Sequence, residues 1–228
     1  MTLVNLGLRF SFTMCNLLSW RLILEEEKKT DWYLKLSVES INEFIKTSSP
    51  LYEIKHPKSL VQSFQISDNK IISSTNTWGV KPSWCPDFLT NTKSEKLISS
   101  PYWSQFINNR ILVPVHSFFE WQTQRTGKKH KYEITFKNPY TYFAGLWGEE
   151  NGIRWITILT GMANEKMKTI HNNGENKHRQ PLVMPKKYQN QWLDQNIKNK
   201  MDITDLFYQF KPDETEEIDL NKEPSLFD

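Results

Sequence analysis

Two hairpin patterns in the middle of the sequence constrain the fold more than any other feature. Apolar and aromatic residues over Ser117–Thr123 and His130–Phe136 flank the turn RTGKK, and those over Tyr140–Trp147 and Ile153–Thr160 flank the turn GEENG. Such pairs, separated by short turns that contain glycine, predict β-hairpins. The sequence does not show the alternation of strands and helices that is typical of a parallel sheet. We therefore expect an α+β protein with a mostly antiparallel, barrel-like sheet.

Short helices should flank this sheet. Apolar residues recur at helical spacing over residues 37–47, and further short helices are expected at Ala163–Ile170 and over residues 186–198. The segment Pro181–Pro185 between them should form a strand. A chain of 228 residues with these elements fits one compact domain, which we place at residues 14–210. Residues 1–13 would be an N-terminal extension, and residues 211–228 an acidic tail held loosely.

Composition limits the functional classes. With 29 basic and 26 acidic residues the net charge is only +3, so nucleic-acid binding would need a local basic patch. The two cysteines, Cys15 and Cys85, form no CxxC pair, which argues against a zinc site, and no motif indicates another metal or cofactor. Arg9 and Arg21 interrupt the apolar N-terminus, so neither a signal peptide nor a membrane span is expected. We predict a cytoplasmic protein.

Four residues have reactive side chains, and each also has a simpler explanation. Cys15 in an apolar run could be a small core residue, and Glu120 between aromatic residues could point outward. His171 at a helix end could interact with the helix dipole, and Asn91 could be a turn residue. Considered singly, these residues do not establish a function.

Considered together, five motifs in order resemble the SRAP family (SOS-response-associated peptidase). Its pattern is an N-terminal Met-Cys, a WG-x-x-P-x-W loop, an Asn-Ala-Arg-x-Glu segment, a [FW]-[FY]-E-W strand, and an Ile-His followed by R-x-P. The matching residues here are Met14-Cys15, Trp78–Trp84, Asn91–Glu95, Phe118–Trp121, and Ile170-His171 with Arg179–Met184.

The resemblance implies a self-processing peptidase that bonds covalently to abasic sites in single-stranded DNA, with lyase-like chemistry, during the response to DNA damage. In that role Cys15 would be the nucleophile, Glu120 the acid/base, His171 the partner of the sugar aldehyde and Asn91 an orienting amide. The DNA would be bound by residues of two kinds: cationic Lys93 and Arg179 for the phosphates, and aromatic Trp78 and Trp84 for the bases. We expect a monomer that associates with the nucleoid when DNA is damaged.

The proposed chemistry requires a free amine on Cys15. An abasic sugar opens to an aldehyde, which an N-terminal cysteine traps as an imine and then as a thiazolidine ring. An internal cysteine has no α-amine and cannot close this ring. Translation must therefore start at Met14, followed by removal of that methionine, or residues 1–14 must be cut away; we favour the first.

The chain departs from the family pattern at three places. Asn16-Leu17 replaces the usual Gly-Arg, Lys93 stands where an arginine is usual, and the loop between His171 and Arg179 (NNGENKH) is longer. Lysine keeps the charge of arginine but not its bidentate geometry.

Two other functions remain open at this point. A cysteine hydrolase could use Cys15 and His171 on other substrates, although the sequence lacks a glycine-rich nucleophile turn. A non-catalytic single-stranded nucleic-acid binding module would rely on Trp78, Trp84 and Lys93 alone.

Overall fold

The computed structural model describes residues 17–20, 53–138 and 140–221. The helix expected at 37–47 and the residues Met14 and Cys15 lie outside these ranges.

The centre of the molecule is a closed five-stranded barrel. Following the hydrogen-bonded neighbours, β10 pairs with β4, β4 with β3, β3 with β6, β6 with β9, and β9 again with β10. Only the β10–β4 contact is parallel. The barrel strands are β3 (Leu60–Ser67), β4 (Lys70–Trp78), β6 (Arg110–Val115), β9 (Thr141–Glu150) and β10 (Ile153–Met162).

Two short strands extend the barrel along β10. β5 (Asn91–Lys93) runs parallel to β10, and β11 (Arg179–Pro181) runs antiparallel to it. Thr160 of β10 is therefore opposite Lys93 on β5 and Pro181 on β11. These strands bring together residues that are far apart in the sequence.

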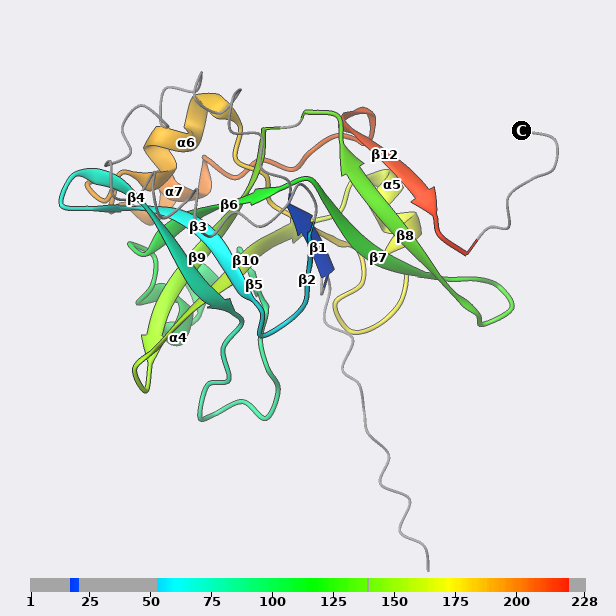
Figure 1. Cartoon of the computed structure of the whole chain (residues 1–228), viewed down its shortest axis with the longest axis horizontal. Coiled ribbons are helices and arrows are strands. Elements are labelled where there is room, and N and C mark those ends of the chain that lie inside the picture. Colours follow the sequence, from blue (N-terminus) through cyan, green and yellow to red (C-terminus); the bar gives the residue numbers. More distant parts are fainter. Residues whose placement is uncertain (1–16, 21–52, 139, 222–228) are drawn as a thin grey trace, which may run out of the picture.

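A second, five-stranded antiparallel sheet lies beside the barrel (Figure 1). Its centre is the predicted hairpin around RTGKK, in which Glu120 is opposite Tyr132. In order across the sheet its strands are β12 (Thr215–Asp219), β8 (Lys129–Phe136), β7 (Ser117–Thr123), β1 (Leu17–Trp20) and β2 (Glu53–Lys55).

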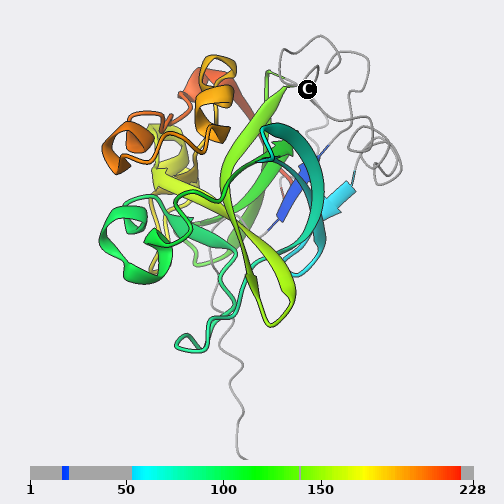
Figure 2. The same ribbon diagram turned by 90° about the vertical axis from the view of Figure 1, so that its left-hand side faces the viewer.

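The helices are short and lie outside the barrel. α6 packs against β6, where the indole N–H of Trp192 donates to the Ile111 carbonyl at 2.8 Å. Together with α7 it lies at one end of the barrel in both ribbon views (Figures 1 and 2). The helices are α3 (Lys96–Ser99), α4 (Pro101–Ser104), α5 (Glu165–Ile170), α6 (Lys186–Leu193) and α7 (Lys200–Thr204).

The barrel wall separates two hydrophobic cores. On β6, Leu112 belongs to one core, while its neighbours Ile111 and Val113 belong to the other, because successive side chains of a strand point to opposite faces. One core fills the barrel and the space under α6. The other lies between the barrel and the second sheet, and includes Phe118 and Ile170. Each such buried side chain contributes roughly 1.5–3 kcal/mol relative to exposure.

The expected fold class is confirmed: the protein is an α+β domain with a mostly antiparallel, barrel-like core and short flanking helices. Both predicted hairpins are present, as β7–β8 and β9–β10. The parallel contacts of β10 with β4 and β5 were not anticipated, because a strand's partners from distant parts of the chain leave no local pattern.

The prediction of a loosely held tail is wrong for residues 215–219. These residues form β12 and pair with β8. Two of its acidic side chains have partners on other elements: Lys166 of α5 contacts Glu217 at 2.8 Å, and the Nδ1 of His130 on β8 lies 2.7 Å from Asp219. A run of like charges that would repel itself in isolation is thus stabilised by its neighbours.

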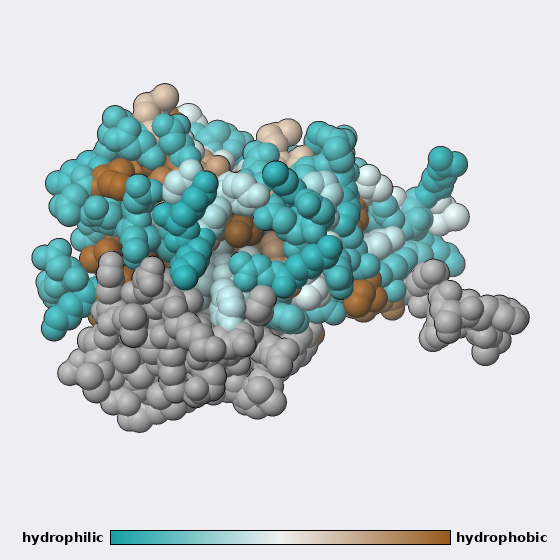
Figure 3. Space-filling view, turned by 90° about the horizontal axis from the view of Figure 1, so that it is seen from above, coloured by the Kyte–Doolittle hydropathy of each residue, from teal (hydrophilic) through white to brown (hydrophobic). Residues whose placement is uncertain are grey.

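The surface over the described residues is mainly polar on the side shown in Figure 3, where the hydrophobic patches are small and separated. Within the same residues, no helix combines the length and the hydrophobicity needed to cross a membrane.

Candidate active site

One wall of the candidate site is formed by β5, β10 and β11. Their registers place Lys93 next to Thr160, and Arg179 opposite Met162. A pocket of about 220 Å³ opens beside these strands. It is lined by three residues that the sequence predicted, Asn91, Lys93 and Arg179, together with Leu89, Thr90, Lys96, Trp103, Thr160 and Asn176.

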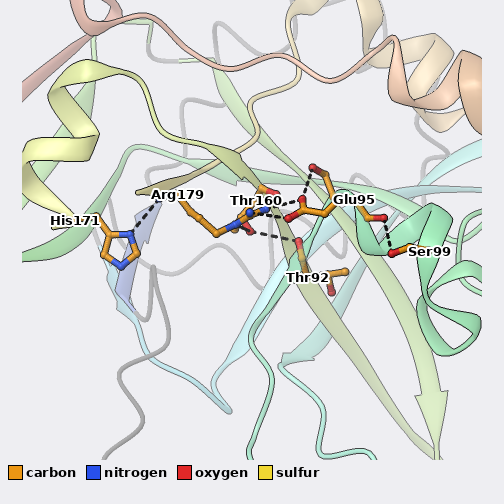
Figure 4. A network of polar contacts seen from close by, with 7 residues as sticks. Thr92, Glu95, Ser99, Thr160, His171 and Arg179 are labelled. Carbon is orange, nitrogen blue, oxygen red and sulfur yellow. Dashed lines mark hydrogen bonds and ion pairs between the residues drawn. The ribbon is translucent and has the colours of Figure 1, made fainter. Parts of the chain in front are cut away.

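Arg179 is held in the protein by an ion pair. Its guanidinium donates to both carboxylate oxygens of Glu95, at 2.7 and 2.8 Å, and also to the backbone and side-chain oxygens of Thr160, at 2.6 and 3.2 Å (Figure 4). The Arg179 side chain is only 8% exposed, whereas that of Glu95 is 56% exposed. Partial burial raises the pKa of Glu95, but the hydrogen bonds and charge of Arg179 outweigh it and hold this pKa below its usual value.

This geometry favours a structural role for Arg179 over the direct phosphate contact that we expected. A bidentate pair satisfies the planar fork of an arginine and neutralises its charge. Lys93 and Lys96 supply the other cationic groups that line the pocket. Arg179 therefore fixes the wall against which a ligand would lie.

His171 occupies the end of α5, where it is 6% exposed. Its Nδ1 accepts a hydrogen bond from the Arg179 backbone N–H at 3.4 Å, and its carbonyl accepts from the His178 N–H at 2.8 Å. Burial lowers the pKa of His171 to about 4, and the positive charges of His178 and Arg179 act in the same direction. The imidazole is thus neutral near pH 7, with Nδ1 as acceptor and the proton on Nε2.

Glu120 lies in the middle of β7 and is 3% exposed, which excludes the simple outward position considered above. Residues two apart on a strand share a face, so Glu120 points to the same side as Phe118 and Gln122. That side faces α5, because Phe118 shares a core with Ile170 and the Gln122 amide donates to the Thr169 carbonyl at 3.0 Å. Glu120 and His171 are therefore carried by adjoining elements and directed toward the same junction.

Cys15, the predicted nucleophile, lies outside the described residues. Leu17, two residues later, is the first residue that the structure describes, and it is opposite Phe119 in the β1–β7 ladder. Cys85 is half-buried and is a free thiol.

The two predicted stacking tryptophans differ. Trp78 is fully buried, and its indole N–H donates to the Thr90 carbonyl at 3.0 Å, so its ring offers no face to a base. Trp78 is therefore a core residue and not the DNA contact that we predicted. Trp84 is 58% exposed and packs edge-on against Tyr102, with ring centroids 5.1 Å apart. Of these two tryptophans, only Trp84 presents an aromatic surface of the kind that can stack on a base.

The backbone conformation requires a glycine directly after Trp78. Gly79 has a φ of +105°, and a Cβ there would lie 2.2 Å from the Phe88 ring. Only glycine is compatible with both conditions. The loop after Trp78 can therefore turn sharply and carry Trp84 to the surface.

Sequence reasoning missed Lys96, Thr160 and Asn176 as residues of the pocket. Lys96 directly follows the matched Glu95, and Asn176 lies in the long loop after His171, but neither carries a pattern that marks a ligand. Only the pairing of β5 and β11 with β10 reveals Thr160. Among the described residues, no group of three or more His, Cys, Asp or Glu side chains could hold a metal ion.

The chain is similar in sequence to known proteins. The chain is 26% identical to the abasic site processing protein YoaM of Bacillus subtilis, over 66% of its own length and 67% of that protein. It is 26% identical to the abasic site processing protein YoqW of Bacillus phage SPbeta, over 66% and 68% of the two chains.

Two crystal structures share the fold. A protein from Bacteroides thetaiotaomicron superposes with a TM-score of 0.69 at 18% identity, covering 89% of this chain and 90% of that one. A phage-related protein from Bordetella bronchiseptica also has a TM-score of 0.69, at 19% identity, with 92% and 95% coverage. The family model "SOS response associated peptidase (SRAP)" matches residues 21–223, which include every motif described above except Met14-Cys15. The chain belongs to the SRAP family.

Proposed function

We propose that this protein acts on abasic sites in single-stranded DNA and forms a covalent thiazolidine link to them through Cys15. The observation that carries the proposal is that Asn91, Lys93 and Arg179, which come from two distant motifs, line one pocket. The names of the relatives, abasic site processing proteins, support the same class of substrate.

The covalent step uses the two nucleophiles of an N-terminal cysteine. After removal of Met14, the α-amine of Cys15 adds to the aldehyde of the opened sugar and loses water to give an imine. The thiol then adds to the imine carbon, its proton passes to the nitrogen, and the five-membered ring is closed. Ring closure is fast because both partners are held in one molecule.

The described residues supply the remaining functions in this proposal. Glu120, on the face of β7 toward α5, moves protons during ring opening and dehydration. Neutral His171 can accept a proton or donate from Nε2 to the sugar oxygen. The Asn91 amide orients the sugar. Lys93 and Lys96 bind the flanking phosphates, and Trp84 stacks on a base.

Proximity in the sequence supports Cys15 as the nucleophile, because Leu17, two residues later, begins strand β1. Leu17 is opposite Phe119, the neighbour of Glu120. We further propose that the protein acts as a monomer in the cytoplasm, at damaged DNA, and removes its own Met14.

The test is a cross-linking assay with single-stranded DNA that contains one abasic site. Protein beginning at Cys15 should give a heat-stable band of lower mobility on a denaturing gel. Cys15→Ser should lose this band, because a hydroxyl forms the corresponding ring far less readily. Cys85→Ser is the matched control and should retain it. A band of equal strength from Cys15→Ser, or from protein that retains Met14, would contradict the mechanism.

A further inference from the structure

The long loop after His171 is joined to strand β7 by an amide side chain. The Asn172 Oδ1 accepts a hydrogen bond from the Thr123 N–H, and its Nδ2 donates to the Thr123 carbonyl, both at 2.9 Å. A neighbouring strand would make the same two bonds to a residue of β7. Among the described residues, the β1–β7 pairing extends to Phe119, and Asn172 bonds the β7 backbone four residues further along the strand, at Thr123.

Two further bonds reinforce this junction. The Gln122 amide donates to the Thr169 carbonyl at 3.0 Å, and the Asn173 amide donates to the Thr123 hydroxyl at 3.0 Å. Residues 169–173 are thereby bonded to residues 122 and 123, next to Glu120 in sequence. His171 is at the centre of the bonded segment.

The other end of the loop closes on His171 itself. The His178 N–H donates to the His171 carbonyl, and the Arg179 N–H donates to its Nδ1. His171 is therefore fixed toward β11 by the backbone of its own loop, and toward β7 by Asn172. In the second contact Asn172 makes both of the bonds to the β7 backbone, in a loop that is longer here than in the family pattern.

We propose that Asn172 is a positioning residue, which holds His171 against the strand that carries Glu120 and keeps its ring shielded from water. This inference rests on the proposed function for its catalytic meaning, but the positioning itself concerns the protein alone. A neutral amide suits the task, since a charged side chain beside His171 would alter the protonation of the ring. The titratable groups of the surrounding elements are then His178 and Arg179 on its own loop, and Glu120, buried on the face of β7 toward α5.

The first experiment follows the His171 ring by NMR titration in the protein without DNA. In the wild type its pKa should be about 4, as burial lowers it. In Asn172→Ala the loop separates from β7, water reaches the ring, and the pKa should rise toward the usual value of about 6.5. Asn173→Ala is the matched control, because it removes two exposed bonds of the same loop, to the Thr123 hydroxyl and from the Gly174 N–H, and should leave the pKa near that of the wild type.

The second experiment measures the rate of cross-linking to abasic single-stranded DNA for the same three proteins. Asn172→Ala should be slower by about tenfold or more, because small displacements of a catalytic group carry large rate losses. Its pH–rate profile should also shift, which a simple loss of folded protein would not cause. If Asn172→Ala does not fold, Asn172→Leu, of nearly equal volume, replaces it in both measurements.

The outcomes separate the two proposals. A His171 pKa and a cross-linking rate in Asn172→Ala that equal those of Asn173→Ala would overturn the positioning role. A raised pKa in Asn172→Ala, with no cross-link from the wild type at all, would support the positioning of His171 and reject the proposed function.

Discussion

Arg179 and His171 are eight residues apart and both are buried, yet the protein holds them by different means. Arg179 keeps its charge and is neutralised by the two oxygens of Glu95. His171 loses its charge, and its segment is held by backbone groups and neutral amides. One wall of the site, which we call the electrostatic wall, is thus held by an ion pair, while the bonds that join β7 to the end of α5 are made by neutral groups; we call the second region the neutral junction.

Loss of the Glu95 carboxylate from the electrostatic wall should have the largest effect on the stability of the protein. Glu95→Ala leaves the buried Arg179 cation with only the oxygens of Thr160, and we expect a loss of about 3 kcal/mol in the free energy of unfolding. Urea denaturation measures this. The control is Glu165→Ala, which removes an exposed ion pair with Lys168 and should cost about 0.3 kcal/mol. Equal losses in the two variants would mean that the Glu95 pair behaves as a surface pair.

The neutral junction should instead respond to pH. The pKa of His171 is lowered to about 4 in the folded protein, so between pH 6.5 and 4 the unfolded chain binds the proton more readily. Its contribution to stability is complete above pH 6.5 and is lost as the pH falls toward 4, by on the order of 3 kcal/mol.

Unfolding in urea at several pH values tests this expectation. His171→Asn removes the titrating ring, so the dependence between pH 6.5 and 4 should be weaker in this variant by the same amount. An unchanged dependence would assign it to the other four histidines or to carboxylates.

The smallest effect is expected at the rim of the electrostatic wall. Lys93→Gln should weaken binding of undamaged single-stranded DNA by about 1 kcal/mol, and reduce the slope of log affinity against log salt by about 0.7, as for one phosphate contact. Fluorescence anisotropy at several salt concentrations measures both. Lys168→Gln, on the exposed side of α5, is the control with no expected effect, and a similar loss in both variants would remove Lys93 from the proposed contact.

Local features of the fold could be predicted from the sequence, whereas the surroundings of the site residues could not. Hairpins such as β7–β8 and β9–β10 were predictable, because alternation and a turn are local signals. The motifs identified Asn91, Lys93, Glu120, His171 and Arg179, but not their surroundings. Burial of Trp78 and the ion pair of Arg179 depend on strands that meet only in the folded chain. The same holds for Lys96, Thr160 and Asn176, whose presence at the pocket follows from the pairing of β10 with β5 and β11.

The closed barrel has a consequence for the order in which the molecule assembles. The β3–β4 and β9–β10 hairpins join residues that are close in the chain, so they can form early. β10 is separated from β4 and β5 by a long stretch of chain that includes β6 to β9. Contacts between distant segments slow folding, because the entropy of the loop must be lost before the contact stabilises anything. A nascent chain on the ribosome cannot make them until β10 has emerged. The pocket beside β10 therefore forms late, because its wall needs β10 and β11 as well as β5.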